Sequence, residues 1–274
     1  MNTNSNVYTV VYTTVIVVLV AAILAVVSQS LKSRQEANEK ADTISQMLTA
    51  AGFGTKAEFQ QIGNAAVIAK YKEEIASAYT VDTDNQKIND LSIENAEIYT
   101  PAKLKKQNYL IKGMQEGQIE LPVFEFKNGI TVVPIYGAGL WGPIWGYIAF
   151  NQPVDGSITI KGAYFDHESE TAGLGSKIKD DPQFQAEFVG EKPDFSQSNI
   201  FEIVKGGSPK NADNSEVIDN KIDAITGATM TSQGLDKAID TWLSAYAKHF
   251  NVPCPVAEEV IAAAETEETK AEEE

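Results

Sequence analysis

The sequence predicts an α+β domain carried on a single N-terminal transmembrane helix. Three observations predict this architecture. Residues 7–27 form an apolar run without a charged residue, short β-rich runs separated by Gly, Pro and Asn follow between residues 109 and 204, and an amphipathic helix is expected at 231–250. With 274 residues, 43% of them hydrophobic, the chain can bury a core, which excludes a wholly disordered protein.

The N-terminal run has the length of a membrane span. At about 1.5 Å per residue, a helix from Val7 to Val27 covers about 31 Å, close to the thickness of a hydrocarbon core. A cleaved signal peptide would carry a positive n-region, whereas no Lys, Arg, Asp or Glu precedes Lys32. We therefore expect residues 1–31 to be a single-pass anchor. Lys32 and Arg34 taken alone would leave the domain in the cytoplasm.

The rest of the chain divides into three parts by composition. Residues 32–108 are expected to form a helical stalk and a variable polar segment, with helices at 28–51 and 57–79 and a polar stretch at 80–101. Residues 109–252 are expected to form the α+β domain, with an antiparallel sheet and flanking helices. Residues 253–274 form an acidic tail that we expect to be disordered. The expected strands are 109–112, 118–126, 130–135, 147–150 and 157–165, followed by short apolar runs at 184–189 and 200–204.

Residue counts exclude several classes of function. The chain has 38 acidic and 22 basic residues, a net charge of −16, which argues against a nucleic-acid partner. One cysteine and two histidines cannot build a disulfide framework, a Cys-rich metal site or a three-His zinc site. The single GxGxxG match, at 137–142, runs into Pro143 and a strand instead of a helix. We predict no catalytic residue and no metal ligand, and the neighbouring Glu168 and Glu170 are not expected to form a glycosidase pair.

The first of three glycine-containing clusters is Asp-Ala-Ile-Thr-Gly-Ala-Thr-Met-Thr-Ser at 223–232, directly before the last amphipathic helix. Small residues let a ligand approach the backbone, and the free N–H groups of a helix start favour phosphate. The alternative is an ordinary helix N-cap made by Thr or Ser. The local chemistry leaves both interpretations open.

This string resembles the D-x-x-[ST]-G-A-[TS] motif of a covalent FMN-binding domain family. The family includes the C subunit of Na+-translocating NADH:quinone oxidoreductases and the G subunit of Rnf electron-transport complexes. The resemblance implies that a separate FAD-dependent flavin transferase joins FMN through a phosphodiester to Thr229. The candidate cofactor-binding residues of this segment are Asp223, Thr226, Gly227, Ala228, Thr229 and Thr231.

The second cluster, His-Glu-Ser-Glu-Thr-Ala-Gly-Leu-Gly at 167–175, resembles the E-T-P-G-L-G loop of the same family, which lies against the flavin. Ala172 stands where the family has Pro, and the loss of a fixed φ puts the rigidity of the loop in doubt. A glycine-rich turn capped by acidic residues is the alternative. The residues carried over are Glu170, Thr171, Gly173, Leu174 and Gly175.

The third cluster, at 136–147, places Trp141 and Trp145 among four glycines. It suits a flat ring that needs an apolar wall and close backbone approach, although two tryptophans can equally fill a small β core. Its G-x-G-L-W-G pattern is similar to the C subunit of the quinone oxidoreductases and less like the Rnf protein.

The resemblance implies a flavoprotein that carries electrons one at a time through covalent FMN, within a complex that couples NADH oxidation and quinone reduction to sodium export. The expected partners are the other subunits of a multi-subunit membrane NADH:quinone reductase and the flavin transferase. The family places the FMN domain on the periplasmic face of the bacterial inner membrane, against the charge bias of the anchor. The alternatives are an Rnf-type G subunit and a membrane-anchored, non-redox binding or assembly module.

Overall fold

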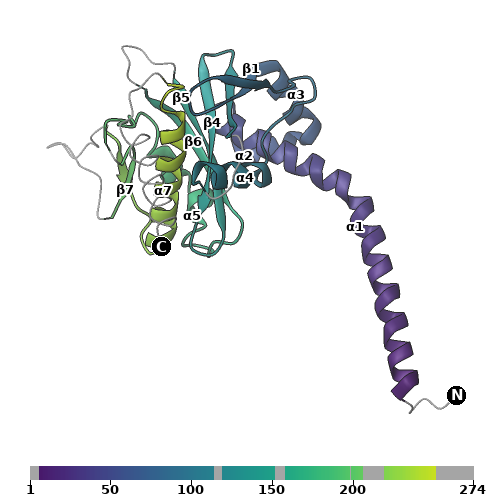
Figure 1. Ribbon diagram of the computed structural model, residues 1–274. Helices are drawn as coiled ribbons and strands as arrows, with labels where there is room; N and C mark the ends of the chain where they lie inside the picture. Colours follow the sequence, from purple (N-terminus) through teal and green to yellow (C-terminus); the bar gives the residue numbers. More distant parts are fainter. Residues whose placement is uncertain (1–5, 114–118, 152–157, 198, 206–218, 251–274) are drawn as a thin grey trace, which may run out of the picture.

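The computed structural model describes residues 6–113, 119–151, 158–197, 199–205 and 219–250. It consists of a six-stranded antiparallel sheet with helices on both faces and a long N-terminal helix that projects from the domain (Figure 1). This confirms the predicted α+β class with its apolar N-terminal helix, antiparallel sheet and flanking helices. The predicted acidic tail and Cys254 lie outside the described residues.

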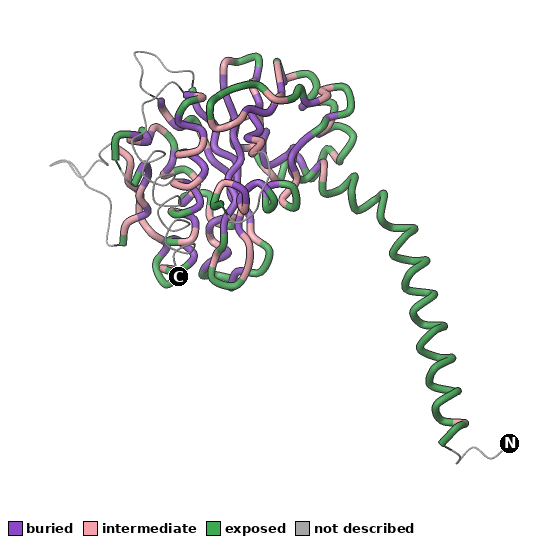
Figure 2. Tube along the Cα trace, viewed as in Figure 1, coloured by how far each residue is buried: buried purple, intermediate pink, exposed green. Residues whose placement is uncertain are grey.

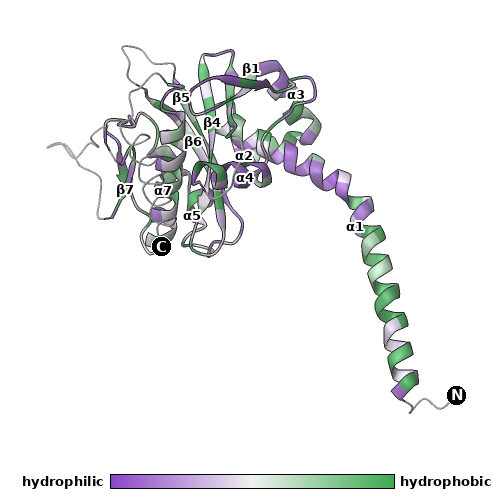
Figure 3. Cartoon of the chain, in the orientation of Figure 1, coloured by the Kyte–Doolittle hydropathy of each residue, from purple (hydrophilic) through white to green (hydrophobic). Residues whose placement is uncertain are grey.

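Helix α1 (Asn6–Ala50) is continuous from the apolar N-terminal run into the domain. Its N-terminal half is hydrophobic and has a window of mean hydropathy 2.9 with no residue buried, as Figures 2 and 3 show. Its last turns are buried in the core, where Ile44, Met47 and Leu48 have no exposed surface. The helix ends at Ala50, and Gly52, the residue predicted to follow its end, has a φ of +80°, while the Phe53 N–H donates to the Leu48 carbonyl at 2.9 Å.

The sheet has the strand order β2-β1-β3-β4-β5-β6, and every neighbouring pair is antiparallel. The longest pairing joins β4 and β5 through a tight turn, from Ile130 opposite Asn151 to Ala138 opposite Pro143. The strands are β1 (Ile75–Val81), β2 (Lys87–Asp90), β3 (Leu121–Phe126), β4 (Ile130–Ala138), β5 (Pro143–Asn151) and β6 (Ile160–His167).

The two faces of the sheet are covered by different helices. On one face α7 (Thr229–Tyr246) packs so closely that a Cβ on Gly137 of β4 would collide with Ala238. On the other face the end of α1 lies against β5 and β6, where a Cβ on Gly162 would collide with the carbonyl of Ala50. The remaining helices are α2 (Lys56–Ile62), α3 (Asn64–Glu74), α4 (Pro101–Ile111), α5 (Lys177–Asp180) and α6 (Pro182–Ala186).

Two segments differ from their predicted structure. The helix expected at 57–79 breaks at Gly63, whose φ is +80°, and from Ile75 the chain becomes strand β1 because that stretch pairs with β3. Tyr109, expected in a strand, lies in α4, which Pro101 starts at a favourable first-turn position. The sheet therefore takes strands β1 and β2 from the part of the chain expected to be stalk and polar segment.

A small parallel pair, β7 (Glu202–Val204) and β8 (Lys221–Asp223), lies beside α7 (Figure 1). Two carboxylates one turn apart on α7 hold it: Asp236 accepts the Ile203 N–H at 2.7 Å and Asp240 accepts the Phe201 N–H at 3.0 Å. Burial, with the neighbouring Asp236 as a smaller cause, raises the pKa of Asp240 to about 7.

This raised pKa predicts a pH-dependent stability. Below the unfolded-state pKa of about 4, Asp240 is protonated in both the folded and the unfolded chain. Its contribution to the free energy of unfolding is lost as pH rises through about 7, because the side chain must then ionise in a largely buried site. Asp240→Asn retains an acceptor for the Phe201 N–H but does not titrate. We expect this variant to gain stability over the wild type on going from pH 5 to pH 8.5, by on the order of 1 kcal/mol.

The measurement is urea unfolding of the detergent-solubilised chain at both pH values. The matched control is Asp180→Asn, a change at an exposed aspartate. A stability difference between Asp240→Asn and the wild type that is the same at both pH values would contradict the assigned role of Asp240.

Candidate functional site

Three segments meet at one end of the sheet. They are the β4–β5 turn at 138–142, the loop at 168–176 that follows β6, and the turn at 224–228 that leads into α7. The carboxylate of Glu170 joins all three, because it accepts the Trp141 N–H at 2.9 Å and the Thr231 hydroxyl at 2.6 Å. The three clusters singled out in the sequence thus come together in space.

The turn before α7 presents an uncapped helix N-terminus. Gly227 has a φ of +83°, a conformation that favours glycine, and α7 begins two residues later at Thr229. The N-cap residue is Ala228, and no side chain caps the helix within the described structure. The first-turn N–H groups and the helix dipole are therefore available to an anion. Of the two interpretations of this segment, the ordinary side-chain N-cap is the one that the geometry does not support.

The hydroxyl groups of this segment differ in burial and in hydrogen bonding. The Thr231 hydroxyl is buried and donates to Glu170, and the buried Ser232 hydroxyl accepts the Ile225 N–H at 3.2 Å. Thr229 is half-buried, Thr226 is exposed, and neither side chain makes a hydrogen bond to the residues described. No described His, Asp or Glu bonds to the Thr229 hydroxyl, so the described part of the chain holds no base hydrogen-bonded to it.

Exposed apolar side chains lie on all three segments. Trp141 is 68% exposed, and a Cβ on Gly227 would stand 3.1 Å from the Leu174 side chain, so the second loop lies directly beside the turn before α7. Large apolar side chains exposed together commonly mark a binding surface. We call this surface the apolar rim; its members are Leu140, Trp141, Leu174 and Met230.

The loop after β6 is closed by its own hydrogen bonds. The Leu174 and Ser176 N–H groups both donate to the Thr171 carbonyl at 3.1 Å, and the Gly173 N–H donates to the Ser176 hydroxyl at 3.1 Å. Gly173 has a φ of +74°, which glycine adopts without strain. The turn is thus defined by hydrogen bonds although Ala172 replaces the expected proline.

Three glycines of the clusters make room for protein side chains. A Cβ on Gly139 or Gly175 would collide with the Glu170 carboxylate, and a Cβ on Gly142 would collide with the Ser169 hydroxyl. The absence of a side chain at these positions lets Glu170 and Ser169 pack against the backbone. Gly175 is itself buried, whereas Gly173 and Gly227 are exposed.

The structure separates the two tryptophans that were expected to form one wall. Trp145 lies opposite Tyr136 in the β4–β5 pairing, on the sheet face covered by α1, and its indole N–H donates to Gln46 Oε1 at 3.1 Å. Gln46 in turn donates to Asp166 at 2.9 Å. Trp145 is therefore not brought together with Thr229, because successive side chains along a strand point to opposite faces of the sheet.

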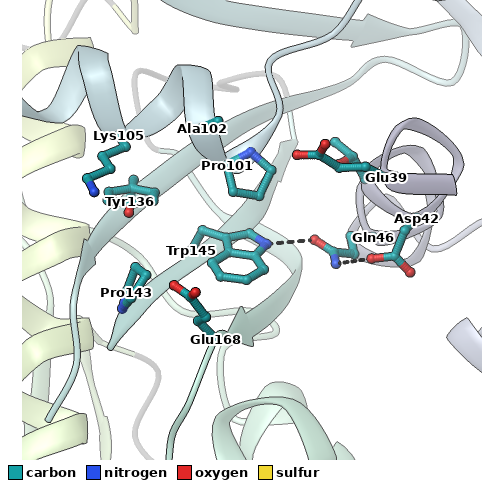
Figure 4. Close-up of a pocket in the computed structure, with 11 residues that line it drawn as sticks. Glu39, Asp42, Gln46, Pro101, Ala102, Lys105, Tyr136, Pro143, Trp145 and Glu168 are labelled. Atoms are coloured by element: carbon teal, nitrogen blue, oxygen red, sulfur yellow. Dashed lines mark hydrogen bonds between the residues drawn. The ribbon is translucent and has the colours of Figure 1, made fainter. Parts of the chain in front are cut away.

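Trp145 lines a pocket of about 370 Å³ between α1, α4 and the sheet (Figure 4). Burial raises the pKa of Tyr136 in its wall to about 12, so this phenol remains protonated at neutral pH. The pocket has both apolar and charged lining residues, and the sheet sets it apart from the start of α7. Its acidic lining residues are Glu39, Asp42 and Glu168.

Asp223, the first residue of the motif, ends β8, and its N–H donates to Glu187 at 3.1 Å. The strand thus fixes the start of the turn that carries Gly227. Among the described residues, no group of three or more His, Cys, Asp or Glu side chains could hold a metal ion. Sequence reasoning missed the contribution of α1, because Gln46 carries no motif and its partners are far away in the chain.

The chain is similar to known proteins in sequence and in fold. The sequence pattern of the FMN-binding domain matches residues 139–244. The chain is 26% identical over 220 residues to the C subunit of Na(+)-translocating NADH-quinone reductase from Vibrio anguillarum, covering 78% of this chain and 80% of the relative. The same subunit from Vibrio vulnificus is 32% identical over 126 residues, which is 44% of this chain and 46% of that protein.

A solved structure has the same fold. The crystal structure of the C subunit of Na(+)-translocating NADH-quinone reductase from Parabacteroides distasonis superimposes with a TM-score of 0.60 at 29% identity, covering 81% of this chain and 98% of that one. The match to the FMN-binding domain includes the β4–β5 turn, the loop after β6 and the start of α7. Residues 139–244 therefore match an FMN-binding domain, and the chain as a whole is similar in sequence and fold to the C subunits of Na(+)-translocating NADH-quinone reductases.

Proposed function

We propose that this chain is the membrane-anchored flavoprotein subunit of a sodium-translocating NADH:quinone reductase, and that it carries FMN bound through a phosphodiester to Thr229. The observation that carries the proposal is the state of the Thr229 side chain. It fills the last position of the flavinylation motif, lies in the first turn of an uncapped helix, and has a hydroxyl with no hydrogen-bond partner among the described residues.

The residues around Thr229 fit FMN on two counts. The first-turn N–H groups of α7 favour the negative charge of a phosphodiester. The apolar rim offers flat and branched side chains to an aromatic ring, with the exposed indole of Trp141 as its largest member. The proposed cofactor contacts are thus Trp141, Leu174, Gly173 and Gly227. Trp145 is left out of this set because it bonds to Gln46 on the other face of the sheet.

The covalent link requires a second protein. In the proposed reaction the Thr229 oxygen bonds to the phosphorus of the FMN half of FAD, AMP leaves, and the hydroxyl gives up its proton. Because the chain shows no base beside Thr229 among its described residues, we assign activation of the hydroxyl to a separate FAD-dependent flavin transferase. When bound, the flavin supplies the redox chemistry, and the chain holds and orients it.

The remaining parts of the reaction belong to partner subunits. A single membrane helix cannot form an ion path by itself, so sodium passage, NADH oxidation and quinone reduction are assigned to the rest of the complex. We propose that the domain faces the periplasm from a bacterial inner membrane. The family resemblance supports this orientation against the two basic residues that follow the span.

The attachment site is tested by substitution in cells that contain the flavin transferase. Thr229→Ala removes the only motif hydroxyl proposed to form the link, so its denatured band should lose flavin fluorescence on an ultraviolet-illuminated gel. Thr229→Ser retains a hydroxyl and should remain fluorescent. The control is Thr241→Val, which removes a hydroxyl from the same helix outside the motif and should not change the signal. A fluorescent Thr229→Ala band would contradict the assigned attachment residue, and a dark band from the wild type would contradict the flavoprotein proposal and favour a non-redox module.

The orientation is tested with Cys254, the only cysteine of the chain. A membrane-impermeant maleimide added to intact cells whose outer membrane is permeabilised should label Cys254, because the domain is proposed to face the periplasm. Cys254→Ser provides the background signal. Labelling that appears only after the inner membrane is opened would reverse the proposed orientation.

A further inference from the structure

Trp141 combines a fixed backbone with a free side chain. Its N–H donates to Glu170 Oε1 at 2.9 Å, and its carbonyl accepts the Ser169 hydroxyl at 3.1 Å. The indole is nevertheless 68% exposed. An indole exposed to water is unfavourable unless a ligand or partner covers it. Here the backbone N–H and the backbone carbonyl of Trp141 are both hydrogen-bonded to the loop after β6. The β4–β5 turn is therefore built to present an aromatic ring in one place.

Glu170 is the residue that holds this turn. Its side chain is only 7% exposed, and each carboxylate oxygen has one protein donor, the Trp141 N–H and the Thr231 hydroxyl. Its own N–H donates to His167 Nδ1 at 3.1 Å. No Lys, Arg or His side chain forms an ion pair with Glu170 within the described part of the chain. A buried carboxylate is costly, so these hydrogen bonds are its main compensation.

The packing around the carboxylate leaves it little freedom. A Cβ on Gly175 would stand 2.5 Å from Glu170 Oε2 and 2.6 Å from the Thr231 hydroxyl, and a Cβ on Gly139 would collide with Oε1. The glycines on either side thus allow the carboxylate to approach two backbones at once. Each oxygen is thus bonded to a protein donor and enclosed by packing, so the protein fixes the position of the carboxylate.

We propose that Glu170 is a positioning residue that fixes the Trp141 indole relative to Thr229, and that it does not bind the flavin itself. One oxygen holds the turn that carries the aromatic ring, and the other holds the helical turn that carries the attachment hydroxyl. The inference deepens the proposed function and rests on it. It changes the role expected for Glu170 from a cofactor contact to a bridge between two cofactor contacts.

Substitutions at Glu170 separate geometry from charge. Glu170→Gln can accept the Trp141 N–H with its carbonyl and donate to the Thr231 oxygen with its amide, so it retains both hydrogen bonds without the charge. Glu170→Ala retains neither. If Glu170 acts by positioning, Glu170→Gln should keep the Trp141 indole in place and Glu170→Ala should not. If it acts through its charge, both variants should lose the wild-type arrangement.

The readout is flavin fluorescence of the folded full-length chain, loaded by the flavin transferase and solubilised in detergent. A tryptophan held against a flavin quenches its emission, so Trp141→Ala defines the unquenched level. We expect Glu170→Ala to raise native fluorescence several-fold, toward that level, and Glu170→Gln to stay close to the wild type. The matched control is Glu168→Ala, which removes an exposed carboxylate two residues away and should leave the emission unchanged.

Fluorescence of the same samples after denaturation measures covalent loading, and thermal unfolding shows whether each variant folds. At equal covalent flavin content, native fluorescence of Glu170→Ala that is as strongly quenched as in the wild type would overturn the proposal. Unquenched native fluorescence of Glu170→Gln would overturn it as well. If Glu170→Ala does not fold, Thr231→Val breaks the bridge on its other side and should raise native fluorescence for the same reason; wild-type quenching in that variant would also overturn it. A dark wild type after denaturation would instead refute the proposed function, and this inference with it.

Discussion

The arrangement of the candidate site depends on one buried carboxylate. Glu170 lies 29 residues from Trp141 and 61 residues from Thr231 in sequence, yet it bonds to both. Each of the three segments is a short connection with little core of its own, and such connections adopt many conformations unless something ties them down. A single side chain with two acceptor oxygens does this without adding bulk, since glycines flank it on both sides.

The same end of the sheet is tied to the membrane anchor. Gln46 near the end of α1 bonds to Trp145 and to Asp166, Asp166 forms an ion pair with Lys179 at 2.8 Å, and the next residue, His167, accepts the Glu170 N–H. Because α1 is one uninterrupted helix, the apolar half and the half that packs in the core cannot turn independently without breaking backbone hydrogen bonds. In the proposed membrane-anchored protein, this continuity would couple the orientation of the site loops to that of the membrane helix.

Local patterns in the sequence predicted the features that depend on neighbouring residues. The uncharged apolar run, the glycine-rich segment between two predicted strands and the motif before α7 were all recognised from adjacent residues. The sequence did not separate Trp141 from Trp145, because which face of a sheet a side chain takes depends on where the strand begins. Nor did it predict strand β1, since Ile75–Val81 gains its strand structure from pairing with β3, which is distant in the chain. The hydrogen bonds of Glu170 are of the same kind, because its two partners lie in the β4–β5 turn and in the first turn of α7.

The central claim is that Thr229, among several nearby hydroxyls, carries the flavin. Fragmentation mass spectrometry of the peptide that spans residues 222–237, from the chain purified with its native flavin transferase activity, tests this claim most directly. We expect a single adduct with the mass of FMN less one water on Thr229, and unmodified Thr226, Thr231 and Ser232. An adduct on another hydroxyl, or an unmodified peptide from cells with an active transferase, would contradict it.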